Sequence, residues 1–471
     1  MNVEPHWTSI IPPLLAVVLA FLTREVVVSL ALACLAGVLL LGQGLQGFPA
    51  LIIRSLARED FIWIASIELC IGVLVAFFRR SGAVAMFTAR AGRWVKSRGQ
   101  VNVLGWLLGL MIFFSDYFSP LFVGPIMRDL TDKHRISREK LAYICDSTSA
   151  PLTAMIPITG WAVYISSQAI GSAGIANASD ALQVFVRSIP FNFYSILTVT
   201  MVLMLALGVI RDFGPMSRAE RRTLDTGLVL RDGAVPLMAK ELTDLEVAAS
   251  ARAHLFFNFL MPILIIVGIN LTTFLITGTP RILEGFMLAC LVLGLTLRLQ
   301  NIDDLQGIMR SVYAGIKGVM PAVMILALAY CINTVSKDMQ TAQYVIRITE
   351  GWLRPALLPA LIFVISGFIS FATGTAWGTY AIMVPIAVPL AYGFNGSQMD
   401  ALVLSSLAAV VGGGIFGDHC SPLSDTTVLS SLGSACDHID HVKTQLPYAL
   451  SAAAVVAVLY LVVGLIWSVG R

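Results

Sequence analysis

The chain alternates long apolar runs with short polar segments from residue 7 to residue 468. Each run holds few charges and approaches the roughly 20 residues that an α-helix needs to cross the hydrocarbon core of a bilayer. A helix also satisfies its backbone hydrogen bonds internally, as lipid requires. We predict about ten spans, at residues 9–22, 25–42, 61–78, 141–168, 191–210, 255–277, 282–298, 312–333, 401–431 and 447–468.

The composition supports this interpretation. Of the 471 residues, 57% are hydrophobic and 13% are charged, whereas soluble domains have about 45–50% and about 25%. A soluble enzyme is therefore excluded, and we expect the lipid bilayer as the surrounding partner. The formal net charge is only +3, and no basic patch typical of nucleic-acid binding is present, so we expect no nucleic-acid partner.

Two further apolar stretches, 101–127 and 356–394, carry prolines near their middles. The segments on either side of 101–127 are both basic, with six Lys or Arg in 79–98 and five in 128–140. Because basic loops stay in the cytoplasm, we predict that 101–127 is a re-entrant hairpin. We interpret 356–394 as a second hairpin that opens outward. In this topology 22 of the 31 basic residues are cytoplasmic, and both termini lie outside.

The order of elements then repeats along the chain. Residues 1–210 and 255–471 each contain three spans, a hairpin and two more spans, of which the first is broken. Five crossings per half place the second half upside down, so we predict two inverted-topology repeats, an architecture known from secondary transporters. Residues 211–254 are predicted to form a solvated cytoplasmic linker.

Four polar motifs lie at corresponding places in the two halves. The hairpins carry SDYFSP at 115–120 and TGTAWGT at 373–379, and the broken spans carry CDSTSAPLT at 145–153 and GDHCSPLSDTT at 417–427. Proline and glycine interrupt helices and free backbone carbonyls. Such backbone is tolerated in a membrane only where it lines a cavity. Carbonyls, hydroxyls and carboxylates are oxygen ligands that suit Na⁺, so the motifs predict a cation site.

These motifs, and GDHCSPLSDTT above all, resemble those of the NhaC family of sodium/proton antiporters, over about residues 60–450. The resemblance implies a site made of two hairpin tips and two unwound helices, an elevator motion, a homodimer and a bacterial inner membrane location. Family members are assigned to sodium/proton exchange, to malate/lactate exchange coupled to sodium, or to amino-acid transport. The substrate therefore stays open.

Carboxylates inside the membrane are the first candidates for function, because each costs about 2.5–3.5 kcal/mol on insertion scales. We predict that Asp146 and Asp418 bind the cation and the proton, supported by Asp425 and Asp116. The predicted Na⁺ ligands are Asp146, Ser147, Asp418 and Ser421. Helix capping is the alternative role for these aspartates.

Further polar and aromatic residues of the four motifs are predicted to line the site. They are Ser115, Ser119, Ser147, Thr148, Thr375, Trp377, Thr379, His419, Ser421, Ser424 and Thr426. The hydroxyls can instead bond carbonyls of the preceding turn. His419 can relay protons, since imidazole titrates near neutrality, or can be a fully hydrogen-bonded lining residue.

Two other groups receive structural interpretations. Glu68 lies in the middle of a span, and we expect it to pair with Lys317, with proton carriage as the alternative. The run DHIDH at 437–441 has a composition that suits metal binding. We favour a solvated cytoplasmic turn for it.

The leading hypothesis is sodium/proton antiport by alternating access, with no cofactor other than Na⁺ as the transported or coupling ion. A carboxylate buried at low dielectric holds its proton more readily, so Na⁺ and H⁺ compete for the same oxygens, which couples their fluxes. The chain has no GxxxxGK nucleotide loop. The alternative is a sodium-coupled transporter or exchanger of an amino acid or small carboxylate. The four motifs contain no Arg or Lys, which argues weakly against a dicarboxylate.

Overall fold

A computed structural model describes residues 4–23, 25–91, 93–113, 116–157, 159–171, 175–238, 247–248, 254–277, 280–349, 354–394 and 399–469. Within these ranges the ordered elements are helices, and the β pairing is an isolated bridge between Pro236 and Asp437. The first half contains α1 (Ile11–Thr23), α2 (Val26–Leu40), α3 (Gly47–Leu56), α4 (Glu59–Arg80), α5 (Ala83–Ala91), α6 (Arg98–Met111), α7 (Phe118–Lys133), α8 (Arg138–Ser147), α9 (Ala150–Thr153), α10 (Gly160–Ser167), α11 (Ala178–Ser188) and α12 (Phe193–Ala206). The remainder contains α13 (Gly214–Thr226), α15 (Met261–Thr277), α16 (Ile282–Leu299), α17 (Leu305–Asp338), α18 (Thr341–Thr349), α19 (Leu358–Thr373), α20 (Ala376–Phe394), α21 (Ala401–Cys420), α22 (Asp425–Gly433) and α23 (His438–Val469).

Seven helices of the described chain are long and apolar enough to cross a membrane, and an eighth is added if α11 and α12, which meet at a 49° bend, form one span. The protein is therefore a polytopic helical membrane protein. Ten spans were predicted, and the difference has a physical reason. At 1.5 Å per residue, the 13 and 15 residues of α1 and α2 reach only about 20 Å, less than the roughly 30 Å of hydrocarbon. The predicted span at 141–168 is divided into the short helices α8, α9 and α10, whereas the span at 401–431 keeps one span-length helix, α21. Helix α20, which lies in the predicted hairpin 356–394, is one of the seven.

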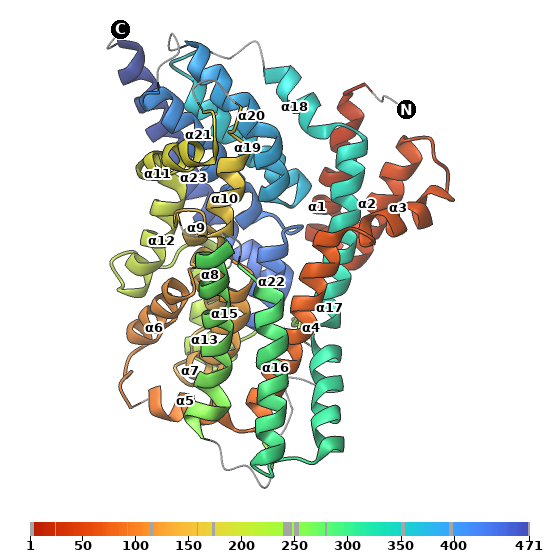
Figure 1. Cartoon of the computed structure of the whole chain (residues 1–471), viewed down its shortest axis with the longest axis vertical. Coiled ribbons are helices and arrows are strands. Elements are labelled where there is room, and N and C mark those ends of the chain that lie inside the picture. Colours follow the sequence, from red (N-terminus) through yellow and green to blue (C-terminus); the bar gives the residue numbers. More distant parts are fainter. Residues whose placement is uncertain are drawn as a thin grey trace.

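The helices pack as two groups that lie side by side in Figure 1. One group, on the right, contains α1 to α4 and α17, with α16 packed on α4. The other contains α8 to α12 and α19 to α23, in which α21 packs against α19, α20 and α23. Helices α22 and α19 contact α17, so the two groups meet along that helix. Residues from both groups thus face each other at this boundary.

Helices in each group approach closely through glycine. A Cβ atom at Gly417 of α21 would lie 2.1 Å from the carbonyl oxygen of Gly367 in α19, and one at Gly72 of α4 would lie 2.4 Å from that of Gly315 in α17. Small residues at helix contacts permit such close approach, and this van der Waals packing holds helices together in lipid. The glycines therefore fix the crossing points of both groups.

The linker between the halves contains α13, which is docked on the rest of the protein by ion pairs, while many residues of 211–238 are exposed. Glu139 and Lys140 of α8, both buried, pair with Arg222 at 3.0 Å and with Asp212 at 2.5 Å. Arg231 pairs with Asp440 at 2.8 Å. That 211–254 is a solvated cytoplasmic linker stays a prediction. Most of 239–254 lies outside the described residues.

Candidate functional site

The polar motifs interrupt helices where the sequence predicts. Helix α21 ends at Cys420 and α22 begins at Asp425, with Pro422 between them and the Ser424 hydroxyl accepting a hydrogen bond from the Thr427 amide at 3.5 Å. In the first half, α8 ends at Ser147, and the short helices α9 and α10 follow. Both predicted helix breaks are confirmed.

Asp418 and Asp425 lie on the two sides of the break between α21 and α22. The Thr426 hydroxyl donates to Asp418 Oδ2 at 3.1 Å, and the Thr426 amide donates to Asp425 Oδ1 at 2.8 Å. The Tyr117 hydroxyl, just before α7, donates to Asp425 Oδ2 at 3.0 Å. The N-cap of α22 is Ser424, and Asp425 is the first residue of the helix, with its second oxygen bound by a side chain from the first half.

Asp146 belongs to a neighbouring network centred on α8 and α23. The side-chain amide of Gln445 donates to Asp146 Oδ2 at 2.7 Å and also to the His419 carbonyl, and His441 Nε2 lies 3.3 Å from the same Asp146 oxygen. The His419 ring joins this network to α12, because its two nitrogens lie 2.9 Å from Ser147 Oγ and 3.0 Å from Tyr194 Oη. The network therefore ties both helix breaks together.

Five buried carboxylates lie at and near the two helix breaks, and several of them repel one another. Asp116, Asp146, Asp418, Asp425 and Glu68 are all buried, with 0% to 8% of their surface exposed. Repulsion links Asp425 to Asp116, Asp418 and Glu68, and links Asp146 to Asp418 and Asp425. Within the described chain, Asp116 Oδ2, Asp146 Oδ1, Asp418 Oδ1 and both Glu68 oxygens have no hydrogen-bond partner. Buried polar atoms nearly always have partners, so this cluster is unusual.

Two structural interpretations from the sequence are wrong. Glu68 does not pair with Lys317, because Glu68 is fully buried next to the aspartates while Lys317 points outward and is exposed. Whether Glu68 and Lys317 can meet depends on how α4 and α17 are shifted along each other. The helical period of the sequence does not determine this shift. Residues 437–441 are also not a solvated turn. His438 and His441 are buried, since α23 begins at His438 and packs on α8 and α22.

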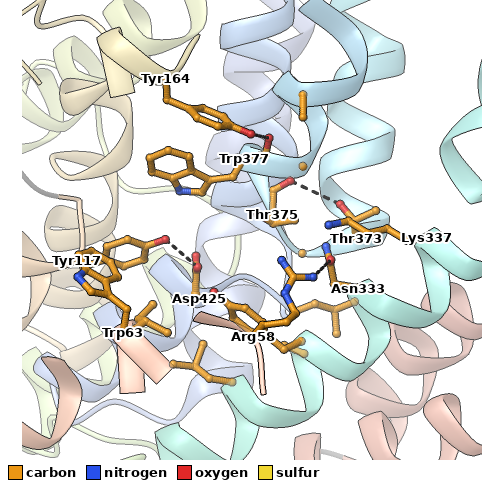
Figure 2. Close-up of a pocket in the computed structure, with 18 of the residues that line it drawn as sticks. Arg58, Trp63, Tyr117, Tyr164, Asn333, Lys337, Thr373, Thr375, Trp377 and Asp425 are labelled. Atoms are coloured by element: carbon orange, nitrogen blue, oxygen red, sulfur yellow. Dashed lines mark hydrogen bonds between the residues drawn. The ribbon is translucent and has the colours of Figure 1, made fainter. Parts of the chain in front are cut away.

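A cavity of about 430 Å³ opens beside Asp425, at the boundary between the two helix groups (Figure 2). Three predicted residues line it, namely Asp425, Thr375 and Trp377. Tyr117, Tyr164 and Trp63 add aromatic walls, and the Tyr164 hydroxyl donates to the Trp377 carbonyl at 3.1 Å. The turn between α19 and α20 reaches this cavity because Gly374 adopts a positive φ of 70°, which favours glycine.

The remaining predicted residues lie outside the cavity lining. Thr148, Thr379 and Ser421 donate to the carbonyls of Ile144, Thr375 and Phe371, so these hydroxyls bond backbone. Ser119 is buried with no partner for its hydroxyl among the described residues. Ser424 bonds Thr426 at 3.0 Å. Ser115 lies outside the described residues.

The four predicted Na⁺ ligands have separate partners. Asp146 bonds Gln445, Ser147 bonds His419, Asp418 bonds Thr426, and Ser421 bonds Phe371. Their convergence on one ion stays a prediction.

The sequence interpretation missed three polar residues of the cavity. Arg58 at the start of α4, and Asn333 and Lys337 on α17, line it opposite Trp377. All three lie outside the four motifs. The available signal was the spacing of Asn333 and Lys337, which are four residues apart and therefore on one helix face. Nothing in the sequence indicated that this face meets Asp425.

Comparison with known proteins identifies the family. The model of the Na⁺/H⁺ antiporter family matches residues 163–465. The chain belongs to this family. The resemblance to NhaC antiporters is thereby confirmed, and the protein is a membrane transporter, not an enzyme.

Three relatives show how far the similarity extends. An uncharacterized protein of Haemophilus influenzae is 33% identical, over 98% of this chain and 91% of its own length. The malate-2H⁺/Na⁺-lactate antiporter of Bacillus subtilis is 32% identical over 25% of this chain and 24% of its own. The arginine/ornithine antiporter of Halobacterium salinarum is 29% identical over 36% of this chain and 33% of its own. The named relatives are all antiporters, of different substrates.

Proposed function

We propose that this member of the Na⁺/H⁺ antiporter family exchanges Na⁺ for H⁺. The observation that carries the proposal is the cluster of five buried carboxylates at and near the helix breaks, several of whose oxygens have no partner among the described residues. Removing an unpaired charge from water costs many kcal/mol. Such a cluster is stable only when protons or cations neutralise part of it.

Competition for these oxygens couples the two fluxes. Asp418 and Asp425 are the central pair, since they are adjacent across the break and share the donor residue Thr426. When Na⁺ occupies the pair the protons leave, and when protons return Na⁺ is released. If only the neutralised forms cross between the two faces, the exchange runs without any covalent step.

We further propose that the chain moves by an elevator motion, with two inverted repeats, in a homodimer of the bacterial inner membrane. The boundary between the helix groups supports the first point, because Asp418 and Asp425 lie on one group, and Glu68 on α4 and the helix α17 face them from the other. In this account the group with α19 to α23 carries the ions past the group with α1 to α4. The pair α6 and α7 and the pair α19 and α20 are then the two re-entrant hairpins.

The test uses the purified protein in proteoliposomes with a pH-sensitive dye inside. Added external Na⁺ should drive proton efflux, and Asp418→Asn should reduce the rate to that of empty liposomes. Asp338→Asn is the matched control, since Asp338 forms a surface ion pair with Arg54 at 3.1 Å. Sodium-driven flux that persists in Asp418→Asn refutes the assignment.

A second candidate function is sodium-coupled exchange of a small organic solute. The cavity favours it, because 430 Å³ is far more than one Na⁺ fills. Two relatives are antiporters of organic solutes, one of malate and lactate and the other of arginine and ornithine. Uptake of labelled organic solutes driven by a Na⁺ gradient in the same proteoliposomes distinguishes this function from simple ion exchange.

A further inference from the structure

We infer that the cavity beside Asp425 binds a small organic molecule through its carboxylate, which Arg58, Asn333 and Lys337 receive, while its apolar body rests on Trp63, Tyr164 and Trp377. The inference rests on the second candidate function above. The residues proposed to bind the carboxylate, Arg58, Asn333 and Lys337, lie outside the four sequence motifs.

The size of the cavity indicates an organic ligand. Its volume of about 430 Å³ lies within the roughly 300–1,000 Å³ of small-molecule sites. A water molecule occupies about 30 Å³ of liquid, so an ion with its first hydration shell would leave much of the space unfilled. Trp63 meets Tyr117 at 5.9 Å between ring centroids, and Tyr164 meets Trp377 at 4.6 Å. These rings form apolar walls of fixed shape.

The polar end of the cavity suits a carboxylate. Arg58 Nη1 donates to Asn333 Oδ1 at 3.4 Å, and its guanidinium lies 5.4 Å from the centre of the Tyr330 ring. Lys337 follows one turn later on α17. Both basic groups also have other partners in the protein, but arginine has five N–H donors and lysine three. Arginine in addition presents two parallel donors that match a carboxylate.

The side chains at the basic end of the cavity differ in burial, which shows where the cavity opens. Asn333 is buried, Arg58 is half-buried and Lys337 is exposed, so the basic end forms the entrance. Asp425 and Tyr117, which are both buried and lie side by side in Figure 2, form the inner end. A bound carboxylate therefore sits at the entrance, and the ligand body extends toward the cation-binding carboxylates. A ligand that also carries an ammonium group would place it near Asp425.

Matched probes distinguish the two kinds of ligand that carry a carboxylate, namely a zwitterionic amino acid and a simple organic anion. We would measure thermal stability of the full-length protein in lipid nanodiscs, at fixed pH and Na⁺ concentration, with phenylalanine, phenylacetate and phenethylamine, and with leucine, 4-methylpentanoate and isopentylamine. Carboxylate-bearing probes should raise the unfolding temperature in a saturable manner, and the amines should not. Stabilisation by the amino acids alone would mean a zwitterionic ligand, and stabilisation by the simple carboxylates as well would mean an organic anion. Both support the site.

Charge-removing variants then test the residues. Arg58→Gln and Lys337→Gln should each weaken binding of the stabilising probe by about tenfold or more, the loss expected for a charge-assisted hydrogen bond. Arg54→Gln is the matched control. Arg54 lies four residues before Arg58, on α3, and pairs with Asp338 at the surface. If Arg58→Gln does not fold, Lys337→Gln alone tests the site, because Lys337 is exposed.

The inference is overturned if no carboxylate probe stabilises the protein, or if both variants bind as the wild type does. The outcome is separate from that of the ion-exchange proposal. Intact Na⁺-driven proton flux without probe binding would refute only the proposed binding site for an organic carboxylate. Probe binding by a protein that shows no Na⁺-driven proton flux would refute only the proposed Na⁺/H⁺ exchange.

Discussion

Single hydroxyl groups decide how the buried carboxylates bind ions. Thr426 is the clearest example, because its hydroxyl donates to Asp418 Oδ2 while its amide donates to Asp425 Oδ1. Hydrogen bonds to an ionised carboxylate stabilise the charged form and lower its affinity for a proton. Thr426 therefore favours release of the proton when Na⁺ arrives. Thr148 looks equivalent in the sequence, yet its hydroxyl bonds only the carbonyls of Ile144 and Cys145.

This contrast gives a prediction. Thr426→Val removes one donor from Asp418 at nearly constant volume, and a net hydrogen bond is worth about 0.5–1.5 kcal/mol. The Na⁺ concentration for half-maximal proton flux should rise about two- to tenfold. Thr148→Val should leave it unchanged. Equal effects of the two substitutions would show that Asp418 is not the ion-binding group.

At the residue scale, sequence reasoning found the carboxylates but not their surroundings. Asp418 and Asp425 were predictable because a charge beside proline and glycine in an apolar run is costly and needs a reason. Arg58 and Lys337 lie near helix ends, where charges are ordinary. Their position in the cavity depends on how α17 packs against α4, α19 and α22, which local sequence does not encode.

At the scale of elements, the contact between α19 and α21 positions the site. Gly413 and Gly417 on α21 lie against the backbone of α19, and a Cβ atom at Gly417 would approach Gly367 O to 2.1 Å. Real Cβ atoms do not come so close to backbone oxygen, so a larger residue separates the helices. The turn at Gly374 would shift with α19, since a Cβ atom there would lie 2.7 Å from Leu423 in the break.

Gly417→Ala should therefore destabilise the protein by about 1–3 kcal/mol, as overpacking does elsewhere, and lower the thermal unfolding temperature in nanodiscs. Gly268→Ala on α15 is the control, because nothing lies within 4 Å of a Cβ atom at that position. That change should be neutral or stabilising by up to about 1 kcal/mol. Similar unfolding temperatures for the two variants would contradict the close contact.

Some elements were predictable and others were not. The breaks at 148–149 and 421–424 follow from local chemistry, since Pro151 and Pro422 lack an N–H donor and the nearby Ser and Thr hydroxyls bond backbone. Helix α11 lies between the predicted spans 141–168 and 191–210 and was not predicted, although Asn177 accepts a hydrogen bond from the Asp180 amide and thereby caps it. Its apolar residues alternate with polar ones in a helical period, and such an amphipathic helix is too polar to be recognised as a span.

At the scale of the whole molecule, two helix groups enclose the site. Both described ends of the chain lie toward the upper part of Figure 1, and α5, which belongs to the basic segment 79–98, lies at the bottom with the connection between α16 and α17. The ion pairs that dock α13 could not be predicted from the sequence, because the charges of the linker are compatible with solvation and with pairing. Their partners on α8 and α23 are distant in the sequence.

The central claim concerns the molecule as a transporter, namely that Na⁺ and H⁺ compete for one carboxylate cluster. The most direct test is calorimetric titration of the purified protein with NaCl, across a series of pH values and with choline chloride as the control. We predict that the apparent Kd for Na⁺ rises as the pH falls, approaching about tenfold per pH unit in the acidic range, and that Na⁺ binding releases protons. An affinity for Na⁺ that is independent of pH, with no protons released, would contradict the account.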